Sequence, residues 1–306
     1  MKIKSLELKN NNILGNLYLD FTDNQGNVIN TVILAGENGS GKSTILNIIY
    51  EFSTYKILRN NRQEIRKFKV KLTEEELEIL YNNEDVKRFL KSQNSSKKIK
   101  NKELMFEFDL SITNSWNQVE VKYLDDTGKE NEINSGYFAR QDIKPIFKTI
   151  FSDAEINFQP NDIRNVTAKN IEQTINNTTR SNPNLPTEIT QLLIDVQTLD
   201  DSEIAEWVRN NPDKKIVLRE IDLRMERFKK AFNFMFDEMQ YKKVINSENT
   251  KKVVFEENGS EIPIENLSSG EKQIVFRGSF LLKDKKSNKG AMVLIDEPEI
   301  SLHPNW

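Results

Sequence analysis

Cysteine is absent from the 306 residues of this chain, and histidine occurs once. Without cysteine there are no disulfide bonds and no thiolate metal sites, which fits the cytoplasm. No apolar run approaches the roughly 20 residues of a membrane span. The N-terminal residues 1–8 alternate like a strand and lack the apolar core of a signal peptide. We therefore expect a cytoplasmic protein without a membrane partner.

Neither sign of charge is in large excess. The net charge is only −3, although 30% of the residues are charged and 37% are hydrophobic. This balance predicts a globular protein with a heavily charged surface, and the length allows one large domain or two. A weak negative charge gives no overall attraction to nucleic acid, so any such binding has to come from local basic patches.

The most specific segment is a complete phosphate-binding loop. It consists of Gly36, Glu37, Asn38, Gly39, Ser40, Gly41, Lys42, Ser43 and Thr44. The apolar run 31–35 before it is expected to be a strand, and residues 45–50 after it are expected to be helical. Glycines let backbone N–H groups close around a polyphosphate, while Lys42 reaches the β and γ oxygens and the Ser43 hydroxyl holds Mg²⁺. The helix N-terminus adds a favourable field for the anion.

A second segment, residues 292–299, is an apolar run that ends in two adjacent carboxylates. A buried strand that stops at Asp296 places this acid at the carboxyl edge of a sheet, where it can hold Mg²⁺. Glu297 is then positioned to orient or deprotonate a water that attacks the γ-phosphate. The alternative is a pair of solvated acids at a strand end.

A third segment, residues 267–271, places Ser268, Ser269, Gly270 and Glu271 just before a helical stretch. A Ser-Ser-Gly turn at a helix start is a second potential anion site. Taken alone it is more typical of an ordinary helix cap.

Together these segments resemble the ATP-binding-cassette class of ATPases, in the branch that contains SMC-like and OLD-like proteins. Residues 36–44 resemble the Walker A loop, 267–271 the signature loop, 294–297 Walker B and 301–304 the D-loop. Ser269 stands where a glycine is usual. The run 295–304 is particularly similar to OLD-like, AAA-type ATPases of bacterial defence operons.

The resemblance implies an α/β P-loop NTPase of the ABC-ATPase head type. Such a head has a mixed sheet flanked by helices, with an antiparallel β subdomain and a helical insertion. It implies ATP and Mg²⁺ as cofactors, Lys42 and Glu297 as catalytic residues, and Ser43 and Asp296 as metal ligands. It also implies a homodimer or higher homo-oligomer, in which Ser268 and Gly270 of one subunit face the ATP of the other.

The family pattern also requires a glutamine at the end of a strand between the Walker A and signature loops. Residues 136–141 are expected to form this strand, which makes Gln141 a candidate catalytic residue and metal ligand and places Arg140 near phosphate. The alternative is an ordinary polar strand end.

Three stretches divide the chain. Residues 1–141 form the N-terminal lobe of the ATPase head, with a helix-and-strand excursion at 51–135; residues 142–250 form a mainly helical insertion; residues 251–306 return to the head. In the lobe we expect strands near 2–9, 17–21, 68–72, 103–113 and 118–124, and a hairpin turn around 114–117. Thr73 and Glu76 predict a capping box for a helix that runs to about residue 91. In the last stretch we expect a strand at 253–255.

The insertion lacks sustained heptads, which argues against the coiled-coil arm of SMC proteins. Its apolar residues recur three or four apart, as on one face of an amphipathic helix. This set is read as core rather than as a partner-docking surface: Ile221, Met225, Phe228, Phe232, Met235, Phe236 and Met239.

The switch histidine of the family is missing, because the sole histidine, His303, matches a D-loop position. We therefore expect the head to be incomplete at Trp306 and to continue in a longer protein.

Two basic stretches offer non-specific contacts to nucleic acid, although a solvated charged surface is the favoured reading. They contain Arg59, Arg62, Arg66, Lys67, Lys69 and Lys71, and Lys87, Arg88, Lys91, Lys97, Lys98, Lys100 and Lys102.

The leading hypothesis is an ATP-hydrolysing molecular switch, the sensor or regulator of an anti-phage defence system that controls a nuclease or toxin effector. The alternatives are a nucleotide-clamped scaffold with little turnover, and an SMC-like DNA-repair ATPase. A transporter motor is disfavoured, because transporter cassettes have a shorter, purely helical region before the signature loop.

Overall fold

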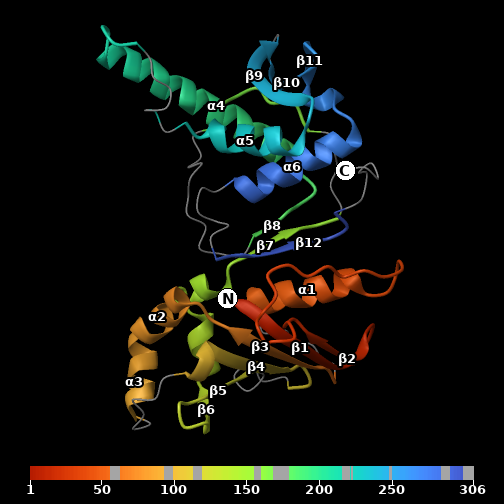
Figure 1. Ribbon diagram of the computed structural model, residues 1–306, viewed down its shortest axis with the longest axis vertical. Helices are drawn as coiled ribbons and strands as arrows, with labels where there is room; N and C mark the ends of the chain where they lie inside the picture. The colour runs from red at the N-terminus through yellow and green to blue at the C-terminus, as the bar shows by residue number, and fades with distance from the viewer. Residues whose placement is uncertain are drawn as a thin grey trace. The chain divides into compact units, whose positions relative to one another are not determined.

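The computed structural model describes residues 1–55, 63–92, 99–112, 119–154, 160–167, 179–215, 221, 223–247, 250–283 and 290–298 (Figure 1). The chain divides into two compact units, and each is described by itself. The first comprises Met1–Ile150, Asn176–Thr179 and Gly290–Leu294, and the second comprises Phe151–Ile175, Arg180–Lys289 and Ile295–Trp306.

The first unit is built on a six-stranded antiparallel sheet of order β2-β1-β3-β4-β5-β6. Its strands are β1 (Lys2–Asn11), β2 (Gly15–Asp20), β3 (Ile65–Lys71), β4 (Glu103–Asp109), β5 (Val119–Leu124) and β6 (Glu130–Ile133). The predicted antiparallel subdomain is confirmed, and so are the predicted strands in this region, although the strand expected at 103–113 already ends at Asp109. The predicted turn at 114–117 lies outside the described residues.

One face of this sheet is aromatic, and helix α1 (Lys42–Ser53) covers it (Figure 1). Phe52 of α1 stacks on Phe68 with ring centroids 4.1 Å apart, and it meets Phe106 edge-on at 5.2 Å. Phe68 and Phe106 are almost fully buried, because alternate residues of a strand point to the same face. Burial of these large rings is the main source of stability for α1.

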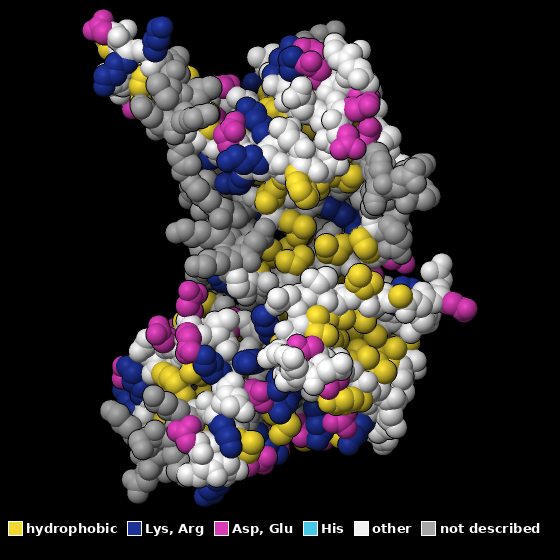
Figure 2. Space-filling view, in the orientation of Figure 1, with side chains coloured by type: hydrophobic (Ala, Val, Ile, Leu, Met, Phe, Trp, Pro, Cys, Tyr) yellow, Lys and Arg dark blue, Asp and Glu magenta, His cyan; other side chains and the backbone are white. Residues whose placement is uncertain are grey.

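The other face of the sheet is charged. Lys67 pairs with Glu107 at 3.0 Å, and Glu103 accepts bonds from both Lys4 (2.6 Å) and Lys69 (3.1 Å). Burial raises the pKa of the Glu103 carboxyl, but the two ammonium groups outweigh this effect and lower the pKa below its usual value. Figure 2 shows acidic and basic side chains interspersed over this part of the chain.

The predicted capping box is present at helix α2 (Glu74–Asn82), where Thr73 and Glu76 exchange hydrogen bonds. The single helix expected to reach residue 91 is instead two helices, α2 and α3 (Glu84–Ser92). Asn83 is extended, and its Oδ1 accepts the N–H groups of Asp85 and Val86, so this residue ends one helix and caps the next.

The strand predicted at 31–35 is wrong. These residues, all of which are described, form no strand, and the side chains of Val32 and Ile33 are 46% and 86% exposed. A fully apolar strand is stable only when neighbouring strands and layers bury both of its faces. The run lacks that burial and stays irregular.

The second unit contains helices α4 (Leu185–Asn210), α5 (Met225–Met235) and α6 (Ser269–Leu282). Its antiparallel sheet has the order β11 (Ser260–Pro263), β10 (Thr250–Glu257) and β9 (Met239–Ser247). The strand predicted at 253–255 is therefore confirmed. Segment 142–250 supplies strands β7 (Thr149–Ser152), β8 (Thr179–Arg180) and β9 in addition to helices.

The core reading of the apolar stripe in this unit is confirmed for most of its residues. Met225, Phe228 and Phe232 on α5 are fully buried, while Phe236 and Met239 are buried from extended backbone beyond the helix. Asp200 of α4 caps α5 by accepting the N–H groups of Arg224 and Met225.

A third sheet has the order β12 (Met292–Ile295), β7 (Thr149–Ser152) and β8 (Thr179–Arg180), and the division between the units falls within these strands. Short 3-10 helices occur at Lys100–Lys102, Ser135–Ala139, Lys144–Phe147 and Ile264–Asn266. None of the helices in the described part of the chain combines the length and apolar composition needed to span a bilayer.

Candidate functional site

The glycine-rich loop of the first unit folds around its own lysine. Gly39 and Gly41 have φ angles of +82° and +91°, in the left-handed region that favours glycine. Helix α1 begins immediately afterwards, at Lys42. The Lys42 ammonium donates to the carbonyl oxygens of Gly36 (2.8 Å) and Glu37 (3.2 Å), so the charge lies at the opening of the loop.

The space beside Gly41 is narrow, in addition to the constraint on its backbone angle. A Cβ at this position would lie 2.4 Å from Cδ2 of Leu14, in the turn between β1 and β2. That turn is fixed by Asn11, whose Oδ1 accepts the N–H groups of Ile13 (3.0 Å) and Leu14 (2.9 Å). The β1–β2 turn therefore lies directly beside Gly41 of the phosphate loop.

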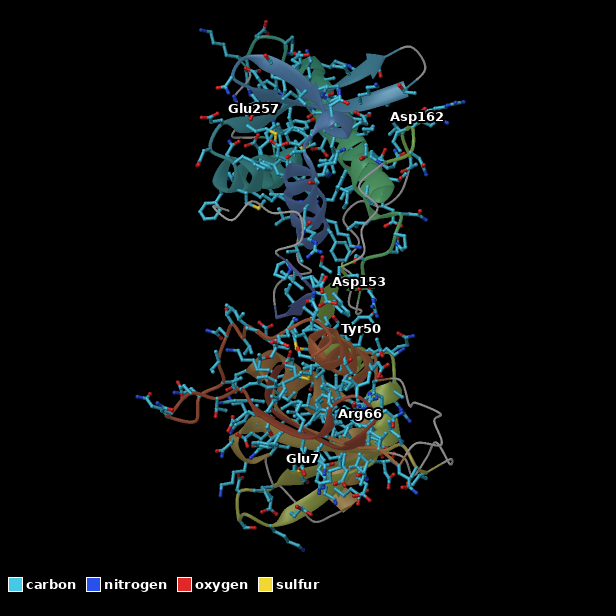
Figure 3. All side chains as sticks on the ribbon, turned by 90° about the vertical axis from the view of Figure 1, so that its right-hand side faces the viewer. Glu7, Tyr50, Arg66, Asp153, Asp162 and Glu257 are labelled. Carbon is cyan, nitrogen blue, oxygen red and sulfur yellow. The ribbon has the colours of Figure 1, made fainter. Side chains whose placement is uncertain are left out.

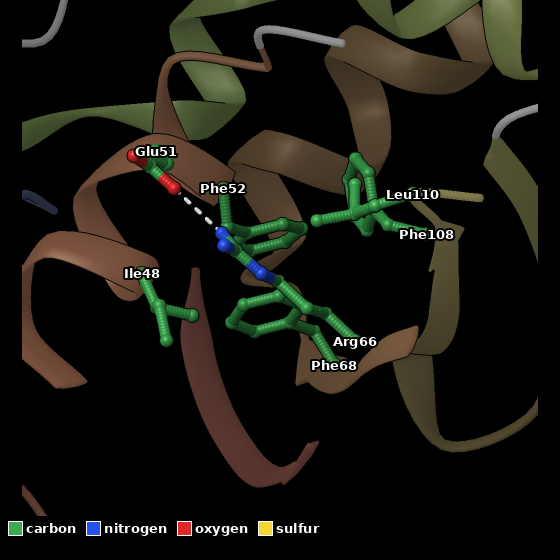
Figure 4. Close-up of a pocket in the computed structure, with 7 residues that line it drawn as sticks. All are labelled: Ile48, Glu51, Phe52, Arg66, Phe68, Phe108 and Leu110. Carbon is green, nitrogen blue, oxygen red and sulfur yellow. Dashed lines mark hydrogen bonds and ion pairs between the residues drawn. The ribbon is translucent and has the colours of Figure 1, made fainter. Parts of the chain in front are cut away.

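A buried ionic network supports this turn. Glu64 is fully buried and accepts bonds from Asn11 (2.8 Å) and from Nε of Arg66 (2.6 Å). Arg66 also reaches Glu51 of α1 at 2.6 Å (Figure 4). Arg66 thus supports the β1–β2 turn through Glu64, and because it is buried it is not a surface contact for nucleic acid. Sequence patterns did not reveal Glu64, because its role depends on partners far away in the chain.

The residues of the loop fit a polyphosphate. Residues 36–40 are exposed, the N-cap Gly41 supplies no side-chain acceptor, and no acidic residue occupies the first turn of α1. N–H groups at this helix end and the Lys42 ammonium are the donors that bind phosphate oxygens. The Ser43 hydroxyl is an oxygen donor of the kind that Mg²⁺ prefers.

The predicted Walker B acids follow strand β12 in the second unit. Asp296 is 5% exposed, and its N–H donates to the carbonyl of Ser152 at 3.0 Å. Glu297 is partly exposed and has a φ of +44°. The strand before them is less buried than expected, since Val293 and Ile295 are 42% and 38% exposed. The predicted D-loop and His303 lie outside the described residues.

The signature residues form the start of helix α6. Ser268 is the N-cap: its hydroxyl accepts the N–H of Glu271 (3.3 Å), and the Glu271 carboxylate accepts the N–H of Ser268 (2.7 Å). Ser268 and Ser269 are exposed, and Gly270 is buried. The capping interpretation of this turn is confirmed, and its two serines remain accessible from solvent.

The strand predicted at 136–141 is wrong. Residues Ser135–Ala139 form a 3-10 helix, whose first turn is capped by the side chain of Asn134. Arg140 forms an ion pair with Asp85, and Gln141 is exposed in the following turn. The single buried residue, Phe138, packs on Phe106 with centroids 5.0 Å apart. The short apolar run that predicted a strand contains one buried aromatic anchor, which holds a 3-10 helix.

A second strand ends beside Asp296, and no sequence motif indicated it. The fully buried strand β7 ends at Ser152 and is followed by Asp153, whose carboxylate pairs with Arg180 at 2.6 Å. An apolar run that stops at an acid is the same signal that identified Asp296. In residues 149–153 the run is too short to stand out.

The basic stretches are largely neutralised where the structure describes them. Lys67, Lys69 and Lys102 pair with Glu107, Glu103 and Glu74. This pairing supports the reading of a solvated, mixed-charge surface. Arg59, Arg62, Lys97 and Lys98 lie outside the described residues.

Comparison with known proteins places these motifs in a family. A search of curated protein sequences found no match. Among solved structures, the chain is similar to the Smc head domain of Pyrococcus furiosus, which was crystallised with an extended coiled coil and bound to the C-terminal domain of ScpA. The identity is 14%, the TM-score is 0.44, and the match covers 99% of this chain and 83% of the Smc chain. The AAA ATPase domain family matches residues 1–306. The chain therefore belongs to the AAA ATPase domain family, the conclusion to which its phosphate loop points.

Proposed function

We propose that this protein binds ATP with Mg²⁺ at residues 36–44, hydrolyses it, and works as a molecular switch. The observation that carries the proposal is the loop geometry: two left-handed glycines, an open helix N-terminus, and a lysine that donates to two carbonyls of the loop. Membership of the AAA ATPase domain family supports the same activity.

The proposed chemistry divides between Lys42 and Glu297. Lys42 exchanges its two carbonyl partners for the β and γ oxygens and stabilises the charge that develops during phosphoryl transfer. Glu297 orients the attacking water and accepts its proton. Ser43 and Asp296, with Gln141 as a further candidate, would hold Mg²⁺, which when bound neutralises phosphate charge.

We further propose a head-to-tail homodimer or higher homo-oligomer with shared ATP sites. In this arrangement Ser268, Ser269 and Gly270 of one subunit contact the γ-phosphate bound by the other. Exposure of both serines at the start of α6 supports this role, because a helix N-terminus is a favourable anion site. ATP then closes the oligomer, and hydrolysis releases it.

The biological output that we propose is control of a nuclease or toxin effector in an anti-phage defence system. Its support is the similarity of residues 295–304 to OLD-like ATPases of defence operons. Non-specific nucleic acid is the trigger that we propose for the same switch.

The test is Glu297→Gln, with Glu257→Gln as a matched control in the β10–β11 hairpin of the same unit (Glu257 is labelled in Figure 3). We expect Glu297→Gln to lower kcat for ATP hydrolysis at least about 100-fold, because it removes the proton acceptor. It should retain ATP and accumulate as an ATP-bound dimer in light scattering, while Glu257→Gln behaves like the wild type. Undiminished hydrolysis in Glu297→Gln would rule out this residue as the base.

A further inference from the structure

The helix that starts at the signature residues carries two buried polar side chains on one face. Gln273 and Arg277 of α6 are four residues apart, so they lie on the same side of the helix. They are only 2% and 7% exposed, respectively. Buried polar groups of this kind are retained where they make specific hydrogen bonds.

Both side chains donate to backbone carbonyls next to Glu297. Arg277 donates through Nη1 to the carbonyl of Asp296 (3.0 Å), and Gln273 donates through Nε2 to the carbonyl of Pro298 (3.2 Å). Arg277 also donates through Nη2 to the carbonyl of Asp153, at the end of β7 (3.1 Å). All of these residues belong to the second unit.

These carbonyls lie on either side of Glu297 in the chain. The Asp296 carbonyl is part of the peptide bond between residues 296 and 297, and the Pro298 carbonyl is part of the peptide bond that follows Pro298. Glu297 itself has a φ of +44°, a conformation that L-residues rarely adopt. Such a backbone persists only where its surroundings hold it in place.

Arginine suits this position better than lysine does. Its planar guanidinium directs several N–H groups in fixed directions and can serve two carbonyls at once, whereas an ammonium on a flexible stem cannot fix both. The neighbouring carboxylate of Asp153, which is labelled in Figure 3, is paired with Arg180. Arg277 therefore links the ends of β7 and β12 through their backbones.

We propose that Gln273 and Arg277 are positioning residues that hold the Glu297 carboxylate in its working orientation from the signature helix. A change at the start of α6, where Ser268 and Gly270 lie, is thereby transmitted along one rigid helix to the proposed base, Glu297. This inference rests on the proposed function and adds to it a physical connection between the signature turn and the proposed base.

The experiment compares Arg277→Gln, Arg277→Lys and Gln273→Leu with the wild-type chain. Arg227→Gln is the matched control, because Arg227 of α5 also donates to a carbonyl, that of Lys283 (3.0 Å), away from Glu297. For each variant, kcat, KM, ATP affinity and melting temperature are measured. If Arg277→Gln does not fold, Arg277→Lys and Gln273→Leu carry the test.

We expect kcat to fall about 10- to 100-fold in Arg277→Gln, since small misplacements of a catalytic group have effects of this size. ATP affinity and KM should stay within about twofold, because the phosphate loop is untouched. Arg277→Lys should recover part of the activity, and Arg227→Gln should match the wild type. Unchanged kcat in Arg277→Gln, or an equal loss in Arg227→Gln, would overturn the inference.

Hydrogen exchange of the peptide that spans residues 292–298 gives a second readout that needs no catalysis. Arg277→Gln should accelerate exchange at the Asp296 amide, which donates to Ser152, while Arg227→Gln should not. Unaltered exchange would refute the positioning role of Arg277 even in a chain that hydrolyses ATP. Faster exchange in a chain that never hydrolyses ATP would support this positioning role and refute the proposed function.

Discussion

At the scale of single residues, the phosphate loop depends on a close contact that its own motif does not contain. A side chain at Gly41 would require the end of the Leu14 side chain to move, while Asn11, which is bonded to Glu64, fixes the backbone of Leu14. Glycine is thus favoured at position 41 by its φ of +91° and by the narrow space beside Leu14. Gly39 has a similar φ of +82°, but nothing lies within 4 Å of its would-be Cβ.

This difference makes Gly41→Ala and Gly39→Ala a matched pair. Both substitutions cost about 1–2 kcal/mol because alanine disfavours a left-handed backbone. Gly41→Ala adds the clash with Leu14, so its melting temperature and its ATP affinity should fall further. Chemical denaturation and ATP titration measure the two effects. Adding Leu14→Ala should recover ATP affinity in Gly41→Ala, and equal stability of the two single variants would contradict this role of Leu14.

Residue patterns revealed the parts of the site whose partners lie within a few positions. The phosphate loop and the helix caps at Thr73 and Ser268 involve neighbours no more than six residues apart, so short sequence motifs predict them. Arg277 and Glu64 act through partners 19 and 53 positions away. No local pattern marks such residues, since their roles arise only when distant segments meet.

At the scale of elements, two helices begin with the same capping box but differ in the function that we assign to them. Thr73 caps α2, and Ser268 caps α6 at the proposed signature turn. In both, the side-chain oxygen accepts the N–H of a glutamate three residues later. Loss of such a cap costs about 1 kcal/mol in either helix.

Thr73→Ala and Ser268→Ala therefore separate capping from catalysis. Both should lower the free energy of unfolding by about 1 kcal/mol in urea titrations. Only Ser268→Ala should also reduce ATP hydrolysis, because its hydroxyl is proposed to contact ATP bound by a second subunit. Equal hydrolysis by the two variants would leave Ser268 with a capping role alone.

Elements were predicted well where burial alternates and poorly where an apolar run has no alternation. Strands β3 and β4 bury every second residue, and their positions could be read from the sequence. Residues 31–35 are uniformly apolar, and their state depends on whether other strands flank them. Residues 136–141 owe their apolar character to Phe138, which anchors a 3-10 helix.

At the scale of the whole molecule, the residues that we propose to act on ATP are found in both units. Residues 36–44 belong to the first unit, while Asp296, Glu297 and the signature turn belong to the second. Each part is supported within its own unit, by the buried Glu64 network in the first and by the Arg277 bonds in the second.

The central claim is that ATP and Mg²⁺ bind through Lys42, and isothermal titration calorimetry measures this directly. Wild type, Lys42→Ala and Lys243→Ala are titrated with ATP, with and without Mg²⁺; Lys243 is a surface lysine paired with Glu261 at 2.6 Å. We predict saturable, Mg²⁺-dependent binding by the wild type and by Lys243→Ala, and its loss in Lys42→Ala. Absence of binding in the wild type, or undiminished binding by Lys42→Ala, would contradict the account.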